Sequence, residues 1–185
     1  MRDYAVDPRR VYVAGLSAGG AAAAVLGDVY PDLYAAIGVH SGLACGAARD
    51  MPSAFTAMQR GGAPQPTNGF QSRVKPARMV PAIVFHGDRD TTVNPRNGDA
   101  VVEQAARGKV LSVSTENGQV VGGHAYRRIR RNDASGKTLI EQWVVHGAAH
   151  AWFGGSSAGT YTDPRGPDAT AEMLRFFLEH PHPAP

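Results

Sequence analysis

The sequence is poor in cysteine and in charged residues, and it has no long apolar run. Cys45 is the only cysteine among 185 residues, and only 19% of the residues are Asp, Glu, Lys or Arg. One thiol cannot close an internal disulfide, and no spacing of Cys and His matches a zinc site. Residues 11–27 carry no charge, but Gly and Ala dominate this run and Asp28 ends it, so it falls short of a membrane span. These absences exclude a disulfide scaffold and a zinc module, and they predict no membrane partner.

The sequence also lacks the basic clusters of a nucleic-acid-binding protein. A total of 19 Lys and Arg against 16 Asp and Glu gives a formal net charge of +3. The one dense basic stretch, residues 127–131, alternates as a strand does and contains no aromatic residue. A groove for nucleic acid needs clustered positive charge with interleaved aromatic side chains, so we predict no nucleic-acid partner. Residues 1–10 are rich in charge and have no apolar stretch, so we expect no signal peptide there.

What the sequence does contain is enough apolar material for one globular domain. Hydrophobic residues make up 43% of the chain, with six Phe, six Tyr and two Trp, and the length suits one domain or slightly more. We expect residues 1–180 to form a single domain and the Pro-rich residues 181–185 to form a tail.

Short β-branched runs alternate with Ala-rich or amphipathic segments along the chain. The former predict strands and the latter predict helices. Strands are expected over 11–14, 35–40, 80–85 and 139–145, and helices over 18–30, 95–107 and 169–179. Most of 42–79 is expected to be a loop or lid, with a helical turn or two around 53–59. Further strands are expected between 109 and 146, with hairpin turns at Asn117-Gly118 and Ser135-Gly136. This alternation predicts an α/β fold of three layers, with helices on both faces of the sheet.

A G-x-S-x-G motif, Gly15-Leu16-Ser17-Ala18-Gly19, lies between a predicted strand and a predicted helix. Its small residues let the strand-to-helix turn close, and the turn projects the Ser17 hydroxyl from the end of the sheet. The N-terminus of the helix that follows favours negative charge developing nearby. The motif in this context predicts a nucleophilic serine, with a structural turn as the alternative.

A serine nucleophile needs a histidine base and a carboxylate that orients the base. Asp88 and Asp90 follow the strand predicted over 80–85, and His146 and His150 follow the strand predicted over 139–145. His150 is favoured over His146, because it lies further beyond the strand in a loop of small residues. The residues alone favour Asp90 over Asp88 only slightly.

The remaining histidines are interpreted as structural or solvated. His40 ends a strand beside Ser41, His86 is placed to brace the loop of the acid, and His124 lies in the hairpin region. Cys45, among Gly and Ala, is expected to be a small buried apolar residue.

The motifs together resemble the polyhydroxybutyrate (PHB) depolymerase-type esterases, α/β-hydrolases related to feruloyl and acetylxylan esterases. The similar segments cover nearly the whole chain: Val6–Gly20, Tyr30-Pro31-Asp32, Gly38–Gly42, Pro52–Phe55, Phe85–Val93, His150–Gly155, Asp163–Ala169 and Arg175-Phe176-Phe177. The motifs that contain Ser17, Asp90 and His150 stand in the order that such esterases have.

The resemblance implies a role for each matching residue. Ser17 would be the nucleophile, Asp90 the acid and His150 the base of a catalytic triad. Ala18 would give one N–H of the oxyanion hole, and Trp152 would form a wall of the substrate pocket, with packing support as its alternative role. Such an esterase uses no metal or organic cofactor. Its substrate would be poly(3-hydroxybutyrate), its oligomers, or short-chain or aromatic esters, and its location would be extracellular.

The sequence departs from the family before the nucleophile strand. Members normally have a preceding segment that supplies the first strands of the sheet and a His-Gly-Cys-type loop with the second oxyanion N–H. We therefore expect a sheet that is truncated on its N-terminal side, with an exposed edge through which the chain could self-associate. The alternatives to an active esterase are a catalytically incompetent fragment or remnant, and a peptidase or thioesterase on the same fold.

Overall fold

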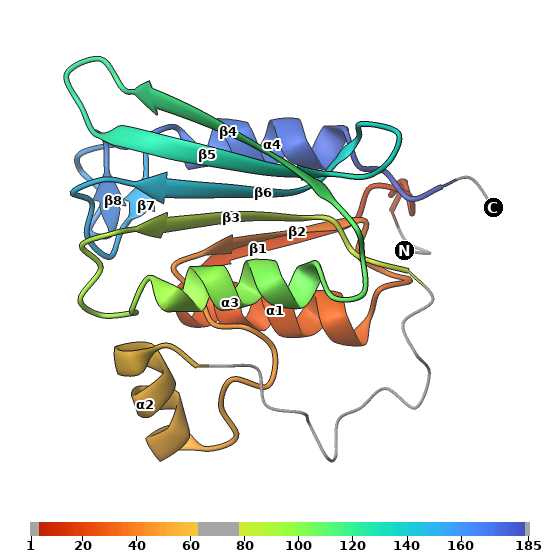
Figure 1. Cartoon of the computed structure of the whole chain (residues 1–185), viewed down its shortest axis with the longest axis horizontal. Coiled ribbons are helices and arrows are strands. Elements are labelled where there is room, and N and C mark those ends of the chain that lie inside the picture. The colour runs from red at the N-terminus through yellow and green to blue at the C-terminus, as the bar shows by residue number, and fades with distance from the viewer. Residues whose placement is uncertain (1–3, 63–77, 184–185) are drawn as a thin grey trace.

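Six strands form one mixed sheet in the computed structural model, which describes residues 4–62 and 78–183. Their order across the sheet is β1-β2-β3-β6-β5-β4 (Figure 1). The strands are β1 (Tyr12–Leu16), β2 (Ala36–His40), β3 (Ala82–Gly87), β4 (Ser112–Gln119), β5 (Ala125–Asn132) and β6 (Thr138–Val145). The first three and β6 run parallel, and β5 and β4 continue the sheet as antiparallel strands. A separate pair of short strands, β7 (Trp152–Phe153) and β8 (Thr162–Asp163), follows β6 in the chain.

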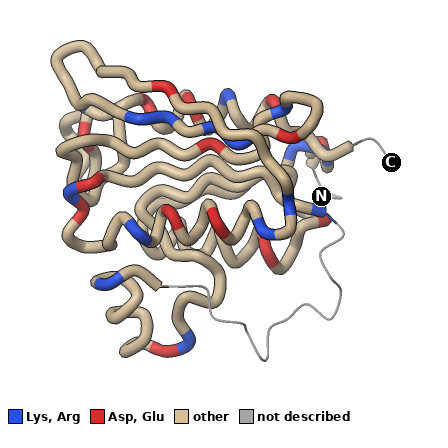
Figure 2. The backbone as a smooth tube through the Cα atoms, in the orientation of Figure 1, with Lys and Arg blue, Asp and Glu red and all other residues tan. Residues whose placement is uncertain are grey.

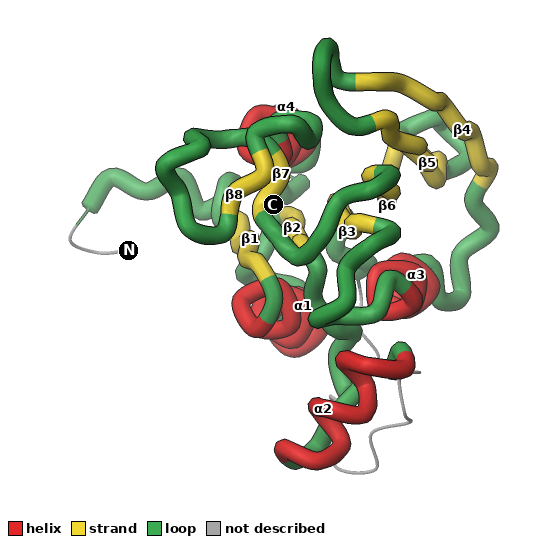
Figure 3. Tube along the Cα trace, turned by 90° about the vertical axis from the view of Figure 1, so that its left-hand side faces the viewer, coloured by secondary structure: helices red, strands yellow, loops and turns green. Residues whose placement is uncertain are grey.

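Helices cover both faces of this sheet. Helices α1 (Ala18–Val29) and α3 (Arg96–Ala105) lie on one face, and α4 (Ala169–Leu178) lies on the other. Viewed along the strands, the three layers are separate, and α2 (Met51–Arg60) lies outside the layer of α1 and α3 (Figure 3). The predicted three-layer α/β architecture is confirmed. The observed bounds of each helix and strand with a predicted range lie within a few residues of that range.

The central strands are buried along their whole length because helices cover them on both sides. Every residue of β2 and β3 is buried. Val39 and Val84 contribute to the core under α1 and α3, whereas Ile83 and Phe85 contribute to the core under α4. This explains why both strands read as continuous apolar runs rather than as alternating ones.

Charged residues are interspersed along the described chain (Figure 2). The basic stretch at residues 127–131 lies in β5, as its alternation predicted, and two of its arginines pair with Glu116 and Glu141. No helix in the described ranges is long and apolar enough to cross a membrane.

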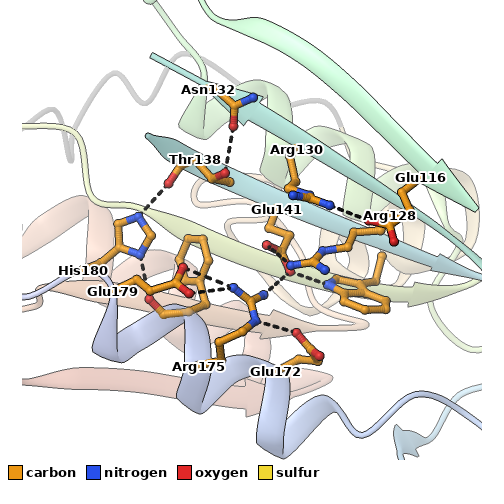
Figure 4. Close-up of polar contacts among 12 residues, drawn as sticks. Glu116, Arg128, Arg130, Asn132, Thr138, Glu141, Glu172, Arg175, Glu179 and His180 are labelled. Atoms are coloured by element: carbon orange, nitrogen blue, oxygen red, sulfur yellow. Dashed lines mark hydrogen bonds and ion pairs between the residues drawn. The ribbon is translucent and has the colours of Figure 1, made fainter. Parts of the chain in front are cut away.

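A buried carboxylate connects the sheet to α4. The side chain of Glu141 on β6 is 1% exposed, and it accepts hydrogen bonds from Arg128 (3.0 Å), Trp143 (2.8 Å) and Arg175 (2.6 Å) (Figure 4). Arg175 comes from α4 and also pairs with Glu172 at 2.7 Å. A buried charge is tolerated where such partners compensate it, so this cluster fixes how α4 sits on the sheet.

One of the two predicted hairpin turns needs correction. Asn117-Gly118 is not a turn but part of β4: the turn between β4 and β5 lies further on, where Gly122 has φ +68°. Gly118 is needed for a different reason, since a Cβ there would lie 2.4 Å from the Tyr126 ring. The predicted turn at Ser135-Gly136 is confirmed, because the Gly136 N–H donates to the backbone carbonyl of Asp133 and Gly136 has φ +85°.

The segment predicted as a loop or lid contains a longer helix than expected. Asp50 caps α2 by accepting from the Ser53 N–H, and Ser53 reciprocates at the Asp50 N–H. This capping box starts the helix at Met51 rather than at residue 53. Residues 63–77 of the predicted lid lie outside the described residues.

The last described residues contact the start of the chain. The His182 N–H donates to the Arg9 carbonyl at 2.8 Å, and Arg9 Nε donates to the His182 carbonyl at 3.0 Å. The boundary of the domain at residue 180 stays a prediction.

Candidate active site

Ser17 occupies the sharp turn between β1 and α1 in a strained conformation. Its φ is 58° and its ψ is −119°, a region that L-residues rarely adopt. Its backbone N–H donates to the carbonyl of His40 on the adjacent strand at 2.9 Å. Strain of this kind persists only where the surrounding structure enforces it, and it is the backbone geometry that the G-x-S-x-G motif predicts.

Glycines make this turn possible. A Cβ on Gly15 would lie 2.3 Å from the carbonyl carbon of Gly19, and one on Gly20 would lie 2.9 Å from the Gly15 carbonyl oxygen. Across the turn, a Cβ on Gly42 would lie 2.7 Å from the backbone of Gly20. The close approach of β1, α1 and the loop after β2 therefore requires small residues at these positions.

The loops after β3 and β6 bring a carboxylate and an imidazole together. His150 Nδ1 lies 2.7 Å from Asp90 Oδ2, and their side chains are 13% and 0% exposed. The other Asp90 oxygen accepts backbone N–H bonds from Thr92 (2.9 Å) and Val93 (2.8 Å). The carboxylate is thus held on both oxygens.

The alternative acid and base pair with each other instead. His146 Nδ1 lies 2.9 Å from Asp88 Oδ2, and these two side chains are 45% and 37% exposed. The structure therefore separates the four sequence candidates into one buried pair and one exposed pair. The buried pair joins the two residues that the sequence favoured.

Asp90 is held in its ionised form. Burial alone would raise the pKa of Asp90, but hydrogen bonds from His86, the Val93 N–H and His150 outweigh burial, and the pKa lies below its ordinary value. An ionised carboxylate only accepts hydrogen bonds. His150 must therefore donate through Nδ1, which leaves its Nε2 free of the proton when the ring is neutral.

His86 braces the acid loop, as the sequence predicted. Its side chain is 2% exposed, its Nε2 lies 2.8 Å from the Val93 carbonyl oxygen and 3.4 Å from Asp90 Oδ2. A carbonyl accepts only, so Nε2 is the protonated nitrogen. The ring thus closes the loop from residue 86 to residue 93 around the carboxylate.

Two further predicted residues lie close to Ser17 and His150 in the chain. Ala18 is the first residue of α1, and N–H groups at a helix start have no acceptor within the helix. Trp152 is half-buried: its ring stacks 5.2 Å from that of His40, and its Nε1 donates to Thr170 Oγ1 at 3.0 Å. These contacts fix the indole in place, so it has a packing role whether or not it also contacts substrate.

Ser17, Asp90 and His150 lie at one edge of the sheet because the parallel strands that precede them all end there. Ser17 follows β1, Asp90 follows β3 and His150 follows β6. Figure 3 looks onto this edge, where the loops after the parallel strands lie. Ligands of open α/β sheets bind at the carboxyl ends of the strands.

Other candidate groups are less suited to chemistry. Cys45 is half-buried rather than fully buried as predicted, and burial raises the pKa of its thiol to about 11, so it is a poor nucleophile at neutral pH. Within residues 4–62 and 78–183, no cluster of three or more His, Cys, Asp or Glu side chains could hold a metal ion.

Residues 1–136 match the protein family described as esterase PHB depolymerase. The chain belongs to this family. The resemblance seen in the sequence motifs is therefore confirmed.

Two curated relatives are similar over most of the chain. It is 30% identical over 169 residues to poly(3-hydroxyalkanoate) depolymerase C of Paucimonas lemoignei, a match that covers 88% of this chain and 38% of the relative. It is 32% identical over 159 residues to poly(3-hydroxybutyrate) depolymerase of Ralstonia pickettii, a match that covers 83% of this chain and 32% of the relative. The chain thus spans about a third of the length of these proteins.

Solved esterase structures share the fold. The acetyl xylan esterase of Aspergillus awamori superimposes with a TM-score of 0.69 at 19% identity, over 96% of this chain and 62% of that one. PHB depolymerase of Penicillium funiculosum gives 0.63 at 20% identity, over 94% and 52%. A PHB depolymerase complexed with an R3HB trimer gives 0.64 at 20% identity, over 93% and 52%. The predicted α/β-hydrolase fold is confirmed, in a chain shorter than these relatives.

Proposed function

We propose that the chain is a serine ester hydrolase with Ser17 as nucleophile, His150 as base and Asp90 as acid. The observation that carries the proposal is the strained Ser17 turn at the same sheet edge as the buried His150–Asp90 pair. These are the parts that acyl transfer needs: a nucleophile, a base and a group that orients the base. The match of residues 1–136 to the PHB depolymerase esterase family supports ester hydrolysis as the reaction class.

In the proposed reaction, His150 Nε2 takes the proton from Ser17 Oγ as the oxygen attacks the ester carbonyl carbon. Asp90 accepts the Nδ1–H bond and stabilises the imidazolium that forms. The carbonyl oxygen becomes an oxyanion, which the Ala18 N–H at the start of α1 would stabilise. The C–O bond to the leaving alcohol then breaks, and the alcohol takes the proton from His150. Water, activated by His150, attacks the acyl-enzyme, releases the acid and restores Ser17.

The proposed substrates are esters of 3-hydroxyalkanoates, either as polymer or as oligomers, with short-chain or aromatic esters as a second class. The two relatives are named as depolymerases of poly(3-hydroxyalkanoate) and poly(3-hydroxybutyrate), and one similar structure is complexed with an R3HB trimer. Trp152 would form an apolar wall against the acyl chain. We also propose an extracellular site of action, as the resemblance to the family implies.

We further propose that β1 forms a pairing edge. Among the described strands, β1 pairs with β2 only, so its outer edge presents N–H and C=O groups that could pair with another strand. Sedimentation velocity across a range of concentrations would detect pairing of two copies. Ala14 on β1 is exposed, so Ala14→Lys serves as the matched variant: it should keep the strand but oppose pairing with a second copy. A wild type that stays monomeric at every concentration would contradict this assignment.

Activity on p-nitrophenyl butyrate tests the proposal, with p-nitrobutyranilide and a butyryl thioester as comparison substrates. We expect the oxygen ester to be hydrolysed fastest, and Ser17→Ala to abolish the reaction. Faster turnover of the anilide or thioester would assign the chain to the peptidase or thioesterase class. A folded wild type no faster than Ser17→Ala would mean a catalytically incompetent fragment or remnant. R3HB oligomers of increasing length then distinguish polyester from small-ester specificity.

A further inference from the structure

His40 contacts both the nucleophile turn and the loop that carries His150. It is the last residue of β2, and its side chain is fully buried. Its carbonyl oxygen accepts the Ser17 N–H at 2.9 Å, and its Nε2 lies 3.1 Å from the Phe153 N–H. Phe153 is three residues beyond His150, so His40 is hydrogen-bonded both to Ser17 and to the loop that carries His150.

These bonds fix the protonation state of His40. The Phe153 N–H is a donor, so Nε2 must be the unprotonated nitrogen of the ring. The proton is then on Nδ1, which lies 3.3 Å from Ser41 Oγ. Burial first, and then the neighbouring His86 and His150, hold the pKa of His40 well below its ordinary value. The ring is therefore neutral at neutral pH, and its Nε2 remains an acceptor.

Aromatic packing fixes the orientation of the ring. The His40 ring stacks with those of Phe85 (5.6 Å between ring centroids) and Trp152 (5.2 Å), and it meets the Phe153 ring edge-on at 4.4 Å. Trp152 is in turn bonded to Thr170 on α4. A ring held on all these sides cannot change rotamer without moving the loop after β6.

We propose that His40 is a positioning residue that aligns His150 with Ser17. The backbone of His40 fixes the nucleophile turn, and its imidazole fixes the loop of the base. His40 would therefore set the distance between Ser17 Oγ and His150 Nε2. The inference rests on the proposed function. Loss of the Nε2 acceptor would leave the Phe153 N–H buried and unpaired, and the loop would shift to satisfy it.

The test compares two variants of the 185-residue chain. His40→Phe keeps an aromatic ring but has no acceptor, whereas His40→Gln can place an amide oxygen near the position of Nε2. On p-nitrophenyl butyrate we expect His40→Phe to lose kcat on the order of 10²-fold with KM almost unchanged, as a displacement of about 1 Å can cause. We expect His40→Gln to stay within about 5-fold of the wild type, since it restores the acceptor. If His40→Phe does not fold, His40→Asn replaces it, because the shorter amide reaches the Nδ1 position but not that of Nε2.

His180 supplies the structural control. It is also buried, and its two ring nitrogens lie 2.6 Å from the carbonyl oxygens of Phe176 and Thr138 (Figure 4). Thr138 is the first residue of β6, whereas the loop with His150 follows the last residue of that strand, Val145. His180 is therefore bonded to the end of β6 that is away from His150. His180→Phe should lower the urea midpoint and leave kcat unchanged. Equal losses of kcat in His40→Phe and His180→Phe, or in His40→Phe and His40→Gln, would overturn the proposal.

A spectroscopic measurement separates this inference from the proposed function. The Nδ1 proton between His150 and Asp90 should give a downfield NMR resonance in the wild type and in His40→Gln, and this resonance should be lost in His40→Phe. If turnover does not depend on Ser17, the proposed function fails, yet the resonance still reports whether His40 holds the His150 loop. An unchanged resonance in His40→Phe would overturn the positioning role.

Discussion

His150 Nδ1 and Asp90 Oδ2 lie 2.7 Å apart although sixty residues separate them in the chain. The contact is buried, and the carboxylate also accepts two backbone N–H bonds. An imidazole held in this way keeps one tautomer and one orientation, which is what the proposed transfer of a proton from Ser17 would require.

Removing the charge of Asp90 should abolish most of the activity. Asp90→Asn keeps the size of the side chain, but its amide favours the wrong tautomer of His150, and kcat should fall on the order of 10⁴-fold. Asp88→Asn is the matched control, because Asp88 pairs with the exposed His146 instead, and its kcat should stay within about 2-fold of the wild type. Steady-state hydrolysis of p-nitrophenyl butyrate measures both, and a larger loss in Asp88→Asn would reverse the assignment of the two acids.

The same carboxylate should contribute to stability in a pH-dependent way. The pKa of Asp90 in the folded chain lies below its ordinary value, which is about 3.9 in an unfolded chain. Its contribution is therefore fully present above that value and is lost as the pH falls towards the folded pKa. The difference in unfolding free energy between wild type and Asp90→Asn should shrink as urea titrations move from about pH 6 to about pH 3. A constant difference over this range would show that Asp90 has an ordinary pKa.

Relief of strain at Ser17 should be measurable apart from catalysis. Ser17→Ala and Ser17→Gly both remove the hydroxyl and should both be inactive. Only glycine adopts φ 58°, ψ −119° without a penalty, so Ser17→Gly should be more stable than Ser17→Ala by about 1 kcal/mol in urea unfolding. If Ser17→Ala proves equal or more stable, the turn is not strained.

The Glu141 cluster should affect stability without affecting turnover. Arg175→Met removes one of the two arginines that neutralise this buried carboxylate, and it should lower the unfolding free energy by about 3 kcal/mol. Glu172 pairs with the same arginine but is more exposed than Glu141. Glu172→Gln should therefore lower the unfolding free energy by less than about 0.5 kcal/mol. Thermal unfolding compares the two, and an equal cost would mean that the cluster is an ordinary surface network.

The sequence predicts most of what depends on local pattern. The Ser17 turn is predictable because its constraint is steric and lies within five residues, and β2 and β3 are predictable because burial on both faces gives uninterrupted apolar runs. The choice between Asp90 and Asp88 is nearly open in the residues themselves, since it depends on which loop position faces His150.

Other features depend on contacts that no local pattern reports. The acceptor role of His40 involves Phe153, 113 residues away, so an imidazole at a strand end gave no signal of it. Asn117-Gly118 was wrong as a turn, because Gly118 is required by the ring of Tyr126 across the ladder rather than by a positive φ.

The central claim is that Ser17 is a nucleophile activated by His150. Treatment of the full chain with diethyl p-nitrophenyl phosphate, followed by peptide mass spectrometry, tests it directly. We expect one diethylphosphoryl adduct, on the peptide that contains Ser17, with release of p-nitrophenol, and no adduct in Ser17→Ala or His150→Ala. Folded wild-type protein that stays unmodified, or that is modified at another residue, would contradict the claim.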